Sequence, residues 1–220
     1  RVRAGGDLTL LAGNDLNAKA LDMAAQGKAT LTAGNDLSIT AGQRTQTLDE
    51  ASFSQSKSKG FGGLGGSTRN ASAAYQIEQS EVITSTLSAQ NLTLQAGRDV
   101  NLTAATLTAQ DKLALTADRD LTVSTAESHI VRHEQQQVTR KENLGLGQQS
   151  LKTTRDEITV TPEISQLSAR DITLQSGRDL SLVAPQIKAD SRIATAGGQL
   201  TVAAATATHE LKETSEFKTN

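Results

Sequence analysis

Two features of this sequence have residue types and spacings that suggest ligand chemistry. Residues 60–65 read GFGGLG and formally match the G-x-G-x-x-G fingerprint of dinucleotide-binding folds. That fingerprint needs a strand before it and a helix after it, so that the helix N-terminus faces the pyrophosphate. Here serines and lysines precede the run and Ser67-Thr68-Arg69-Asn70 follow it. We therefore interpret residues 60–65 as the tip of a hairpin and predict no cofactor.

The second feature is a pair of histidines, His129 and His133, four residues apart. On a helix this spacing would let two imidazoles share a metal ion. On the strand that we predict for this segment, four residues span roughly 13 Å, too far for one coordination sphere. We therefore predict that both histidines, and His209 as well, are solvated side chains and that the chain holds no metal.

A Gly-x-Asp unit recurs along the chain and resembles part of the calcium-binding nonapeptide repeat. Calcium binding is an alternative, but that repeat has a nine-residue period, whereas the intervals here are about eight and thirteen residues. We interpret the unit as a turn, in which glycine tolerates a positive φ and aspartate accepts hydrogen bonds from nearby amides. The predicted turn caps are Asp7, Asp15, Asp36, Asp99, Asp120 and Asp179.

Composition argues against an enzyme and against a nucleic-acid-binding protein. A polysaccharide-degrading β-helix would need clustered carboxylates and aromatic platforms, but aromatic residues make up 2% of this chain and its aspartates are evenly spaced. The net charge of −2, with no long basic run, gives no electrostatic footprint for nucleic acid. The chain has no cysteine, which excludes disulfides. It shows no signal peptide and no apolar run of about 18 residues. It begins and ends within the repeat pattern, so we expect a segment of a longer protein.

Apolar residues recur at intervals of 20–21 residues, and this spacing predicts the fold. Triplets such as Leu-Thr-Leu have the period of a strand, with two side chains inward and one outward. Each interval holds three apolar stations, the third being Leu21/Met23, Leu107 or Ile187, so we predict three short strands and three turns per coil. One coil is too small to be stable alone, so the coils must stack. We predict a right-handed parallel β-helix, all-β in class, with about 21 residues per coil. The predicted core ladder is Leu8, Leu16, Leu37, Leu92, Val100, Leu113, Leu121, Ile172, Leu180, Ile193 and Leu200.

Insertions interrupt the coils after every second one. Each insertion has two arms of alternating residues around a glycine-rich centre, which predicts a β-hairpin that projects from the solenoid or lies along it. A disordered loop is the alternative, because loops of this length are often unstructured. The predicted divisions are coils at 1–42, 87–126 and 167–205, hairpins at 43–86 and 127–166, and the start of a third hairpin at 206–220.

Four apolar residues lie at the predicted tips of the hairpins: Phe61, Leu64, Leu144 and Leu146. Packing of each tip onto the shaft or the next insertion would account for them. Contact with a partner or a lipid interface is the other hypothesis, since exposed apolar patches often mark interaction sites.

With these motifs in view, the chain resembles the haemagglutinin-repeat regions of filamentous haemagglutinin and of contact-dependent growth-inhibition effectors of CdiA type. The resemblance rests on the repeated unit Ala-Gly-x-Asp-Leu-x-Leu-x-Ala and covers essentially the whole chain. Paired coils separated by glycine-centred insertions are more similar to the second repeat class of the growth-inhibition effectors than to an uninterrupted adhesin shaft.

The resemblance implies a non-catalytic repeat of a large surface filament, exported by two-partner (type V) secretion through an outer-membrane transporter. It implies a location on the surface of a Gram-negative bacterium, with retention in the periplasm before target contact as an alternative. The function it implies is support of toxin delivery across the outer membrane of a target bacterium, with the target-cell envelope or a receptor as partner and lipid contact through the hairpins. The alternative is the structural shaft of a filamentous adhesin with a role in virulence.

Overall fold

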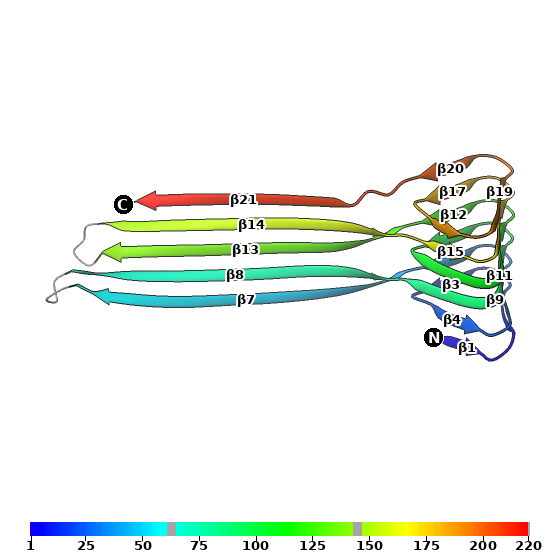
Figure 1. The fold of residues 1–220 in the computed structure, drawn as a ribbon, viewed down its shortest axis with the longest axis horizontal. Coiled ribbons are helices and arrows are strands. Elements are labelled where there is room, and N and C mark those ends of the chain that lie inside the picture. The colour runs from blue at the N-terminus through cyan, green and yellow to red at the C-terminus, as the bar shows by residue number, and fades with distance from the viewer. Residues whose placement is uncertain (61–64, 143–146, 220) are drawn as a thin grey trace. The chain divides into compact units, whose positions relative to one another are not determined.

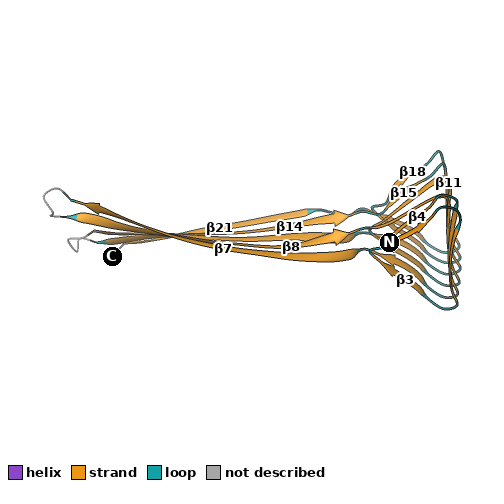
Figure 2. Ribbon diagram, turned by 90° about the horizontal axis from the view of Figure 1, so that it is seen from below, coloured by secondary structure: helices purple, strands orange, loops and turns teal. Residues whose placement is uncertain are grey.

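The computed structural model describes residues 1–60, 65–142 and 147–219, and over these residues the regular structure is entirely β-strand. Figure 1 labels the strands, and Figure 2 colours the chain by secondary structure. Contacts divide the chain into two units, each described by itself. Unit 1 comprises Arg1–Arg44, Glu81–Ser128 and Pro162–Thr206, and unit 2 comprises Thr45–Ser80, His129–Thr161 and Ala207–Asn220.

Unit 1 is a parallel β-helix whose coils form two sheets over the described residues. The ten-stranded sheet contains β1 (Val2–Ala4), β2 (Leu8–Ala12), β4 (Asp22–Ala25), β5 (Lys28–Ala33), β9 (Ser85–Ala96), β11 (Ala105–Ala117), β15 (Gln166–Ser168), β16 (Asp171–Ser176), β18 (Gln186–Lys188) and β19 (Ser191–Ala196). The six-stranded sheet contains β3 (Leu16–Lys19), β6 (Leu37–Thr40), β10 (Val100–Thr103), β12 (Leu121–Ser124), β17 (Leu180–Val183) and β20 (Leu200–Ala203).

Equivalent residues of successive coils pair in parallel register in these sheets. Leu16 pairs with Leu37, and Leu37 pairs with Val100, although the first insertion separates the latter two in sequence. Parallel strands carry equivalent side chains directly above one another. The parallel β-helix with coils of about 21 residues and hairpin excursions is therefore confirmed as the fold class.

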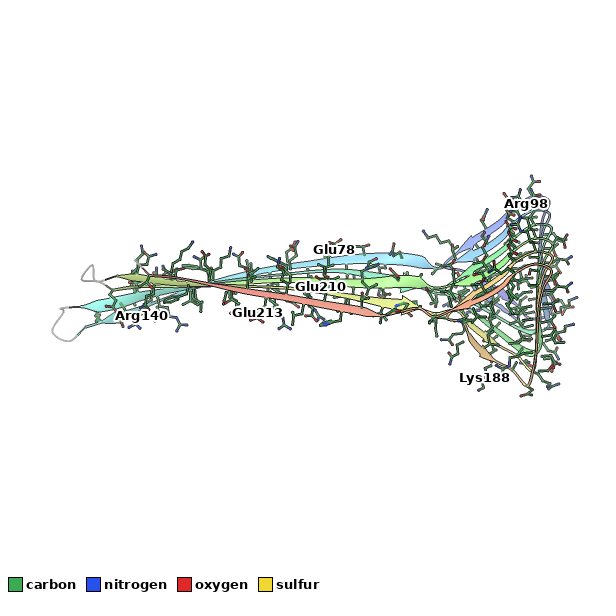
Figure 3. All side chains as sticks on the ribbon, turned by 90° about the horizontal axis from the view of Figure 1, so that it is seen from above. Glu78, Arg98, Arg140, Lys188, Glu210 and Glu213 are labelled. Atoms are coloured by element: carbon green, nitrogen blue, oxygen red, sulfur yellow. The ribbon has the colours of Figure 1, made fainter. Side chains whose placement is uncertain are left out.

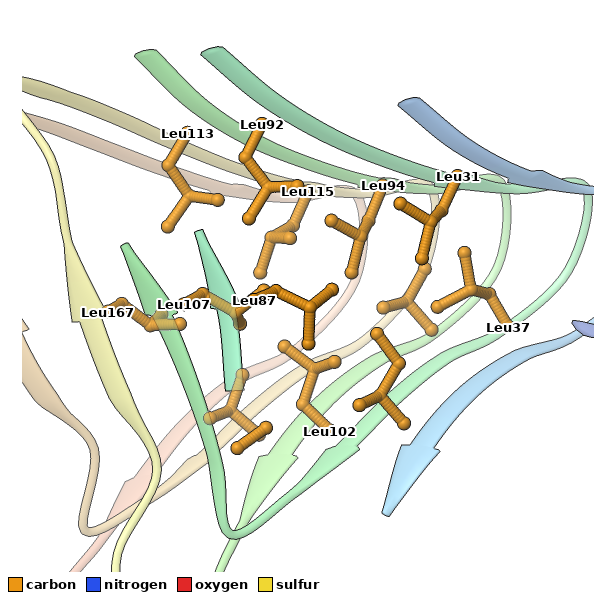
Figure 4. Close-up of a cluster of buried hydrophobic side chains, with 14 of the residues drawn as sticks. Leu31, Leu37, Leu87, Leu92, Leu94, Leu102, Leu107, Leu113, Leu115 and Leu167 are labelled. Carbon is orange, nitrogen blue, oxygen red and sulfur yellow. The ribbon is translucent and has the colours of Figure 1, made fainter. Parts of the chain in front are cut away.

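The core of unit 1 is a thin stack of aliphatic side chains between the two sheets, and Figure 4 shows part of it. Strand alternation turns every second residue inward, so each triplet of the Leu-x-Leu type contributes two core residues. Seven members of the predicted ladder are buried: Leu37, Leu92, Val100, Leu113, Leu121, Ile172 and Leu180.

The remaining four members of the predicted ladder lie in the outermost coils. Leu8 and Leu16 are half-buried and Leu200 is 52% exposed, because a coil at either end has a neighbour on one side only. The placement of Ile193 in the core was wrong. The last coil repeats after 20 residues, so Ile172 pairs with Arg192 while Ile193 pairs with Thr173 and is 57% exposed. A slip of one residue moves a side chain to the other face of its strand.

The expectation of three separate strands per coil holds only in part. In the two central coils the third station of one coil and the first station of the next are continuous, which gives the long strands β9 and β11. The structure also changes the role of the turn glycines, because Gly34, Gly97 and Gly177 do not have a positive φ. A Cβ added at Gly97 would lie 2.2 Å from the carbonyl oxygen of Gly34, so close contact between coils requires glycine there.

Positive φ occurs instead at three alanines of unit 1. Ala20, Ala104 and Ala184 have φ values of 49°, 45° and 43°. Each occupies the same corner in the first coil of a pair, directly after a strand of the six-stranded sheet. A left-handed alanine is strained relative to glycine, and no sequence signal predicted this corner.

Unit 2 is a five-stranded antiparallel sheet in the order β21-β14-β13-β8-β7. The first insertion supplies β7 and β8, the second supplies β13 and β14, and the chain segment after the last coil supplies β21. Strand β8 pairs with β13 over fourteen residue pairs, from His129–Ser80 to Glu142–Ser67, so the two hairpins form one sheet. The strands are β7 (Gly42–Lys59), β8 (Gly66–Ile83), β13 (Ala126–Glu142), β14 (Gln148–Glu163) and β21 (Thr208–Thr219).

Candidate functional site

Five of the six predicted turn caps form a continuous column before the strands of the six-stranded sheet: Asp15, Asp36, Asp99, Asp120 and Asp179. Asp7 lies at another corner of the first coil, before β2. Each aspartate accepts a backbone hydrogen bond from the next coil rather than from its own turn. Oδ1 of Asp15 accepts from the Asp36 amide at 3.2 Å, and Oδ1 of Asp99 accepts from the Asp120 amide at the same distance. Asp7, Asp36, Asp120 and Asp179 make the same kind of bond, to the amides of Lys28, Asp99, Asp179 and Gln199.

Three arginines neutralise the middle of this column. Arg98 donates from Nε to Oδ1 of Asp36 at 3.0 Å and from Nη2 to Oδ2. Arg119 contacts Asp99 in the same way, and Arg178 contacts Asp120. A guanidinium that grips both oxygens of a carboxylate gives geometric specificity as well as attraction. Each arginine precedes the aspartate of its own turn and pairs with the aspartate of the coil before.

These contacts keep three carboxylates ionised. The side-chain hydrogen bond from Arg98 holds the pKa of Asp36 below its ordinary value, and Arg119 and Arg178 lower the pKa of Asp99 and of Asp120 in the same way. A general acid working near neutral pH needs a raised pKa. The arrangement therefore suits a structural seam between coils and not acid–base catalysis.

Two buried serines join the coils where each hairpin returns to the helix. Oγ of Ser85 donates to the carbonyl oxygen of Thr40 at 2.7 Å and accepts from the Leu21 amide at 3.0 Å. Ser165 repeats this arrangement, with Oγ donating to the Ser124 carbonyl at 2.7 Å and accepting from the Ala105 amide at 3.1 Å. Both serines are fully buried. Each hydroxyl gives one backbone amide a partner, and it is a second donor to a carbonyl that also accepts from the amide of Ala20 or Ala104 at 3.0 Å.

The two faces of the unit 2 sheet carry different cations. The registers of β8 with β13 and of β14 with β21, together with cross-strand contacts such as Arg132–Glu157, assign every described strand residue to a face. One face, called here the Arg face, carries the described arginines of unit 2: Arg69, Arg132, Arg140 and Arg155. The opposite face, the Lys face, carries the described lysines: Lys57, Lys59, Lys141, Lys152, Lys212 and Lys218. Figure 3 shows Arg140 and Glu213 projecting from one side of the sheet and Glu78 from the other.

The Arg face is also the more apolar of the two. It carries Leu48, Tyr75, Ile77, Ile130, Val138, Leu151, Leu211 and Phe217. Arginine is more weakly hydrated than lysine and is favoured where a surface is covered, whereas lysine is strongly hydrated. The difference between the two faces therefore marks the Arg face as the side of the sheet better suited to contact.

The histidines lie on strands, as predicted. His133 contacts the Asp156 carboxylate on the neighbouring strand, and His209 contacts Glu157 at 3.0 Å. The His209 contact is the main cause that lowers the pKa of Glu157. Within the described ranges, no group of three or more His, Asp or Glu side chains could hold a metal ion, and no helix is long and apolar enough to cross a membrane.

The structure also bears on the dinucleotide fingerprint. Strand β8 begins at Gly66, directly after residues 60–65, so a strand follows where a dinucleotide site would need a helix. The predicted tip residues Phe61, Leu64, Leu144 and Leu146 lie outside the described residues.

The contacts of the three arginines and of the two buried serines were not predicted from the sequence. A visible signal existed for the arginines, since Arg-Asp recurs at residues 98–99, 119–120 and 178–179. The serines have a weaker signal, a Ser-x-Leu triplet at the end of each insertion, at residues 85–87 and 165–167.

Comparisons with known proteins agree with this geometry. A family model described as hemagglutinin repeat matches residues 1–139 and again residues 131–217. Comparisons with curated proteins and with solved structures gave no match. The matched family is one of structural, non-enzymatic repeats found in secreted or cell-surface filamentous proteins. Since the two matches together span nearly the whole chain, this protein belongs to the hemagglutinin-repeat family.

Proposed function

We propose that the chain is a repeat segment of a two-partner-secreted filament that supports toxin delivery into a target bacterium. The observation that carries the proposal is the alternation of two coils with one hairpin, with the hairpins joined into a sheet of their own. A shaft needs only stacked coils, so a second sheet with two exposed faces suggests a further role in contact. The partners would be an outer-membrane transporter during export and the envelope of the target cell afterwards.

Adhesion is the second candidate function. The family match supports a structural repeat of a filamentous adhesin as directly as it supports a delivery module. In that case the coils would be a spacer, and the binding determinants would lie elsewhere in the filament.

Removal of the hairpin sheet from the full-length protein tests the proposal. The deletion would join Arg44 to Glu81 and Ser128 to Pro162 through short Asn-Gly turns. Short joins suffice, because Arg44 contacts Glu81 across the base of the first hairpin and Ser128 lies 3.5 Å from Glu163 at the base of the second. Coil stacking would be retained.

We expect export of the shortened filament at the level of the parent protein and loss of target-cell killing. Surface display of the filament serves as the control for export. Killing at the parental level would contradict the proposed role in delivery. Loss of cell adhesion by a filament that carries no toxin would favour the adhesin alternative.

A further inference from the structure

One row of the Arg face departs from the charge pattern of the rest of the sheet. Along β14 and β21 the register sets acid opposite base, with Lys152 opposite Glu216 and Arg155 opposite Glu213. Between β8 and β13, by contrast, Arg69 lies directly opposite Arg140. Like charges at opposed positions of an antiparallel pair destabilise it. Two guanidiniums side by side are therefore a feature that the stability of the sheet alone does not explain.

The carboxylate nearest to this pair only partly offsets its charge. Glu142 lies 4.0 Å from Arg140, and both side chains are more than half exposed, so solvent screens the contact. The next row on the same face, near the end of β7 and the start of β8, adds hydroxyl groups. The Oγ atoms of Ser58 and Ser67 lie 3.0 Å apart there. Two guanidiniums with neighbouring hydroxyls form a set of donors suited to the oxygens of a phosphate group.

An apolar row lies beside the arginine row on the same face. Arg69 and Arg140 are followed one step along their strands by Ala71 and Val138. Leu151 and Phe217 extend this row across β14 and β21, where they lie directly opposite each other. They are 42% and 63% exposed, which is unusual for side chains of this size at neighbouring positions.

The two rows line one depression of about 440 Å³ in unit 2. Among the described residues its lining includes both arginines and no acidic side chain: Ser56, Ser58, Ser67, Arg69, Val138, Arg140, Gln149, Leu151 and Phe217. A ligand that fills it must offer an anion to one end and hydrocarbon to the other. A free phosphate would leave the apolar row exposed to water, and a neutral chain would leave the two charges unpaired.

We propose that this depression binds an anionic phospholipid, with the phosphate held by Arg69 and Arg140 and the acyl chain along Val138, Leu151 and Phe217. This inference deepens the proposed function, because it names the chemistry by which the hairpin sheet would contact an envelope. Arginines near an anionic membrane surface contribute about 1 kcal/mol each, so loss of both should weaken binding by at least about tenfold.

Vesicle binding by the 220-residue chain tests the proposal. The probe is a vesicle of equal parts phosphatidylglycerol and phosphatidylcholine, with vesicles of phosphatidylcholine alone as reference. We expect binding to the anionic vesicles only, a loss of about tenfold or more in R69Q/R140Q, and a clear loss in L151T/F217T. Threonine is chosen because it keeps the β-propensity of the two strands. Far-UV circular dichroism of each variant would verify that the sheet remains folded.

The matched control is K57Q/K59Q, which removes two positive charges from the Lys face of β7. We expect this variant to bind within about twofold of the parent chain, because exposed charges more than a Debye length from the lipid are screened. Equal losses in the lysine and arginine variants would mean general attraction to a charged surface and would overturn the site. Binding of L151T/F217T at the level of the parent chain would contradict the proposed contact between the apolar row and an acyl chain. If the parent chain did not bind the anionic vesicles, the lipid site would be wrong. The proposed function would still stand if killing required the hairpins.

Discussion

Each central aspartate of the turn column makes two contacts with the next coil. Its carboxylate accepts a hydrogen bond from a backbone amide, and it also accepts hydrogen bonds from the guanidinium of an arginine. Asp99 shows both, through the Asp120 amide and through Arg119. These contacts lie at the surface, where an isolated ion pair contributes little. Several such pairs along the column can together stabilise the stack, since each aspartate–arginine pair links one coil to the next.

The aspartate–arginine pairs predict a loss of stability in acid. The pKa of Asp36, Asp99 and Asp120 is lower in the folded chain than the ordinary value of 3.8, mainly because of the arginines. The unfolded chain therefore binds protons first as the pH falls. The stabilising contribution should be complete above about pH 5 and should disappear as the pH falls below 3.8 through the folded-state pKa.

Comparison with R98Q/R119Q/R178Q isolates that contribution. We expect the parent chain to unfold at a higher temperature than this variant at pH 7 and the difference to shrink at about pH 2.5. The control K57Q/K59Q/K141Q removes the same charge from unit 2 and should not show this convergence. A difference between parent and R98Q/R119Q/R178Q that stays constant across the pH range would be inconsistent with the pairing.

The buried serines predict a larger effect from a smaller change. Ser85→Ala would leave the Leu21 amide without the hydroxyl that it contacts, while the Thr40 carbonyl would keep its bond from the Ala20 amide. A buried polar group without a partner costs about 1–3 kcal/mol, so we expect a loss of about 2 kcal/mol in the free energy of unfolding. Urea denaturation measures this quantity. Ser88→Ala in the same strand is the control and should cost less than about 0.5 kcal/mol; equal costs would contradict the bridging role.

Single residues were the hardest level to predict from sequence. The spacing of the aspartates indicated a structural role in turns but not that each carboxylate contacts the next coil. The arginines were visible in the motif, yet pairing with the previous aspartate requires the register of neighbouring coils. Ser85 and Ser165 are ordinary serines in sequence, and their burial follows only from where the hairpins leave and rejoin the helix.

At the scale of elements, the turn between the two sheets depends on close approach of neighbouring coils. The amide of Gly97 donates to the Ala33 carbonyl at 3.1 Å, and a Cβ on Gly97 would lie 2.2 Å from the Gly34 carbonyl oxygen. Any side chain there must push two coils apart. Substitutions that overpack a close contact of this kind cost about 1–3 kcal/mol.

A matched pair of substitutions tests this reason for glycine. We expect Gly97→Ala to lower the free energy of unfolding by about 1–3 kcal/mol. Gly13→Ala changes the equivalent glycine of the first coil, where no atom lies within 4 Å of the added Cβ, and should change stability by less than about 0.5 kcal/mol. Equal losses of stability for the two variants in chemical denaturation would mean that backbone entropy, not contact between coils, is the reason for glycine at residue 97.

Strands were predicted correctly from the sequence where the repeat length is constant, and they were placed wrongly or missed where the repeat length changes. The strands around Leu37, Val100 and Leu121 follow from their spacing and alternation. Ile193 was misplaced because one residue is missing from the last coil, and a period of 21 cannot show on which side of a strand the change falls. The pairing of β8 with β13 was not predicted, since alternating polar strands carry little information about their partners.

On the scale of the whole molecule, the chain repeatedly leaves the β-helix and returns without interrupting it. Coils before and after each insertion stack directly, as shown by Leu37 pairing with Val100 and by Leu121 pairing with Leu180. The hairpins likewise pair with one another in unit 2. Coils and hairpins can therefore both be added, repeat by repeat, in a chain of the hemagglutinin-repeat family.

Disulfide trapping can test whether the coils stack across the first insertion, because the chain has no cysteine of its own. Ser38 and Asn101 are partners in adjacent coils, and Thr122 lies one coil further on. Neighbouring strands are about 4.8 Å apart, within the range of about 4.4–6.8 Å between the Cα atoms of a disulfide. We predict efficient oxidation of S38C/N101C to an internal disulfide and none in S38C/T122C. Failure of the first variant to form the bond, or equal oxidation of both, would contradict the stacked coils.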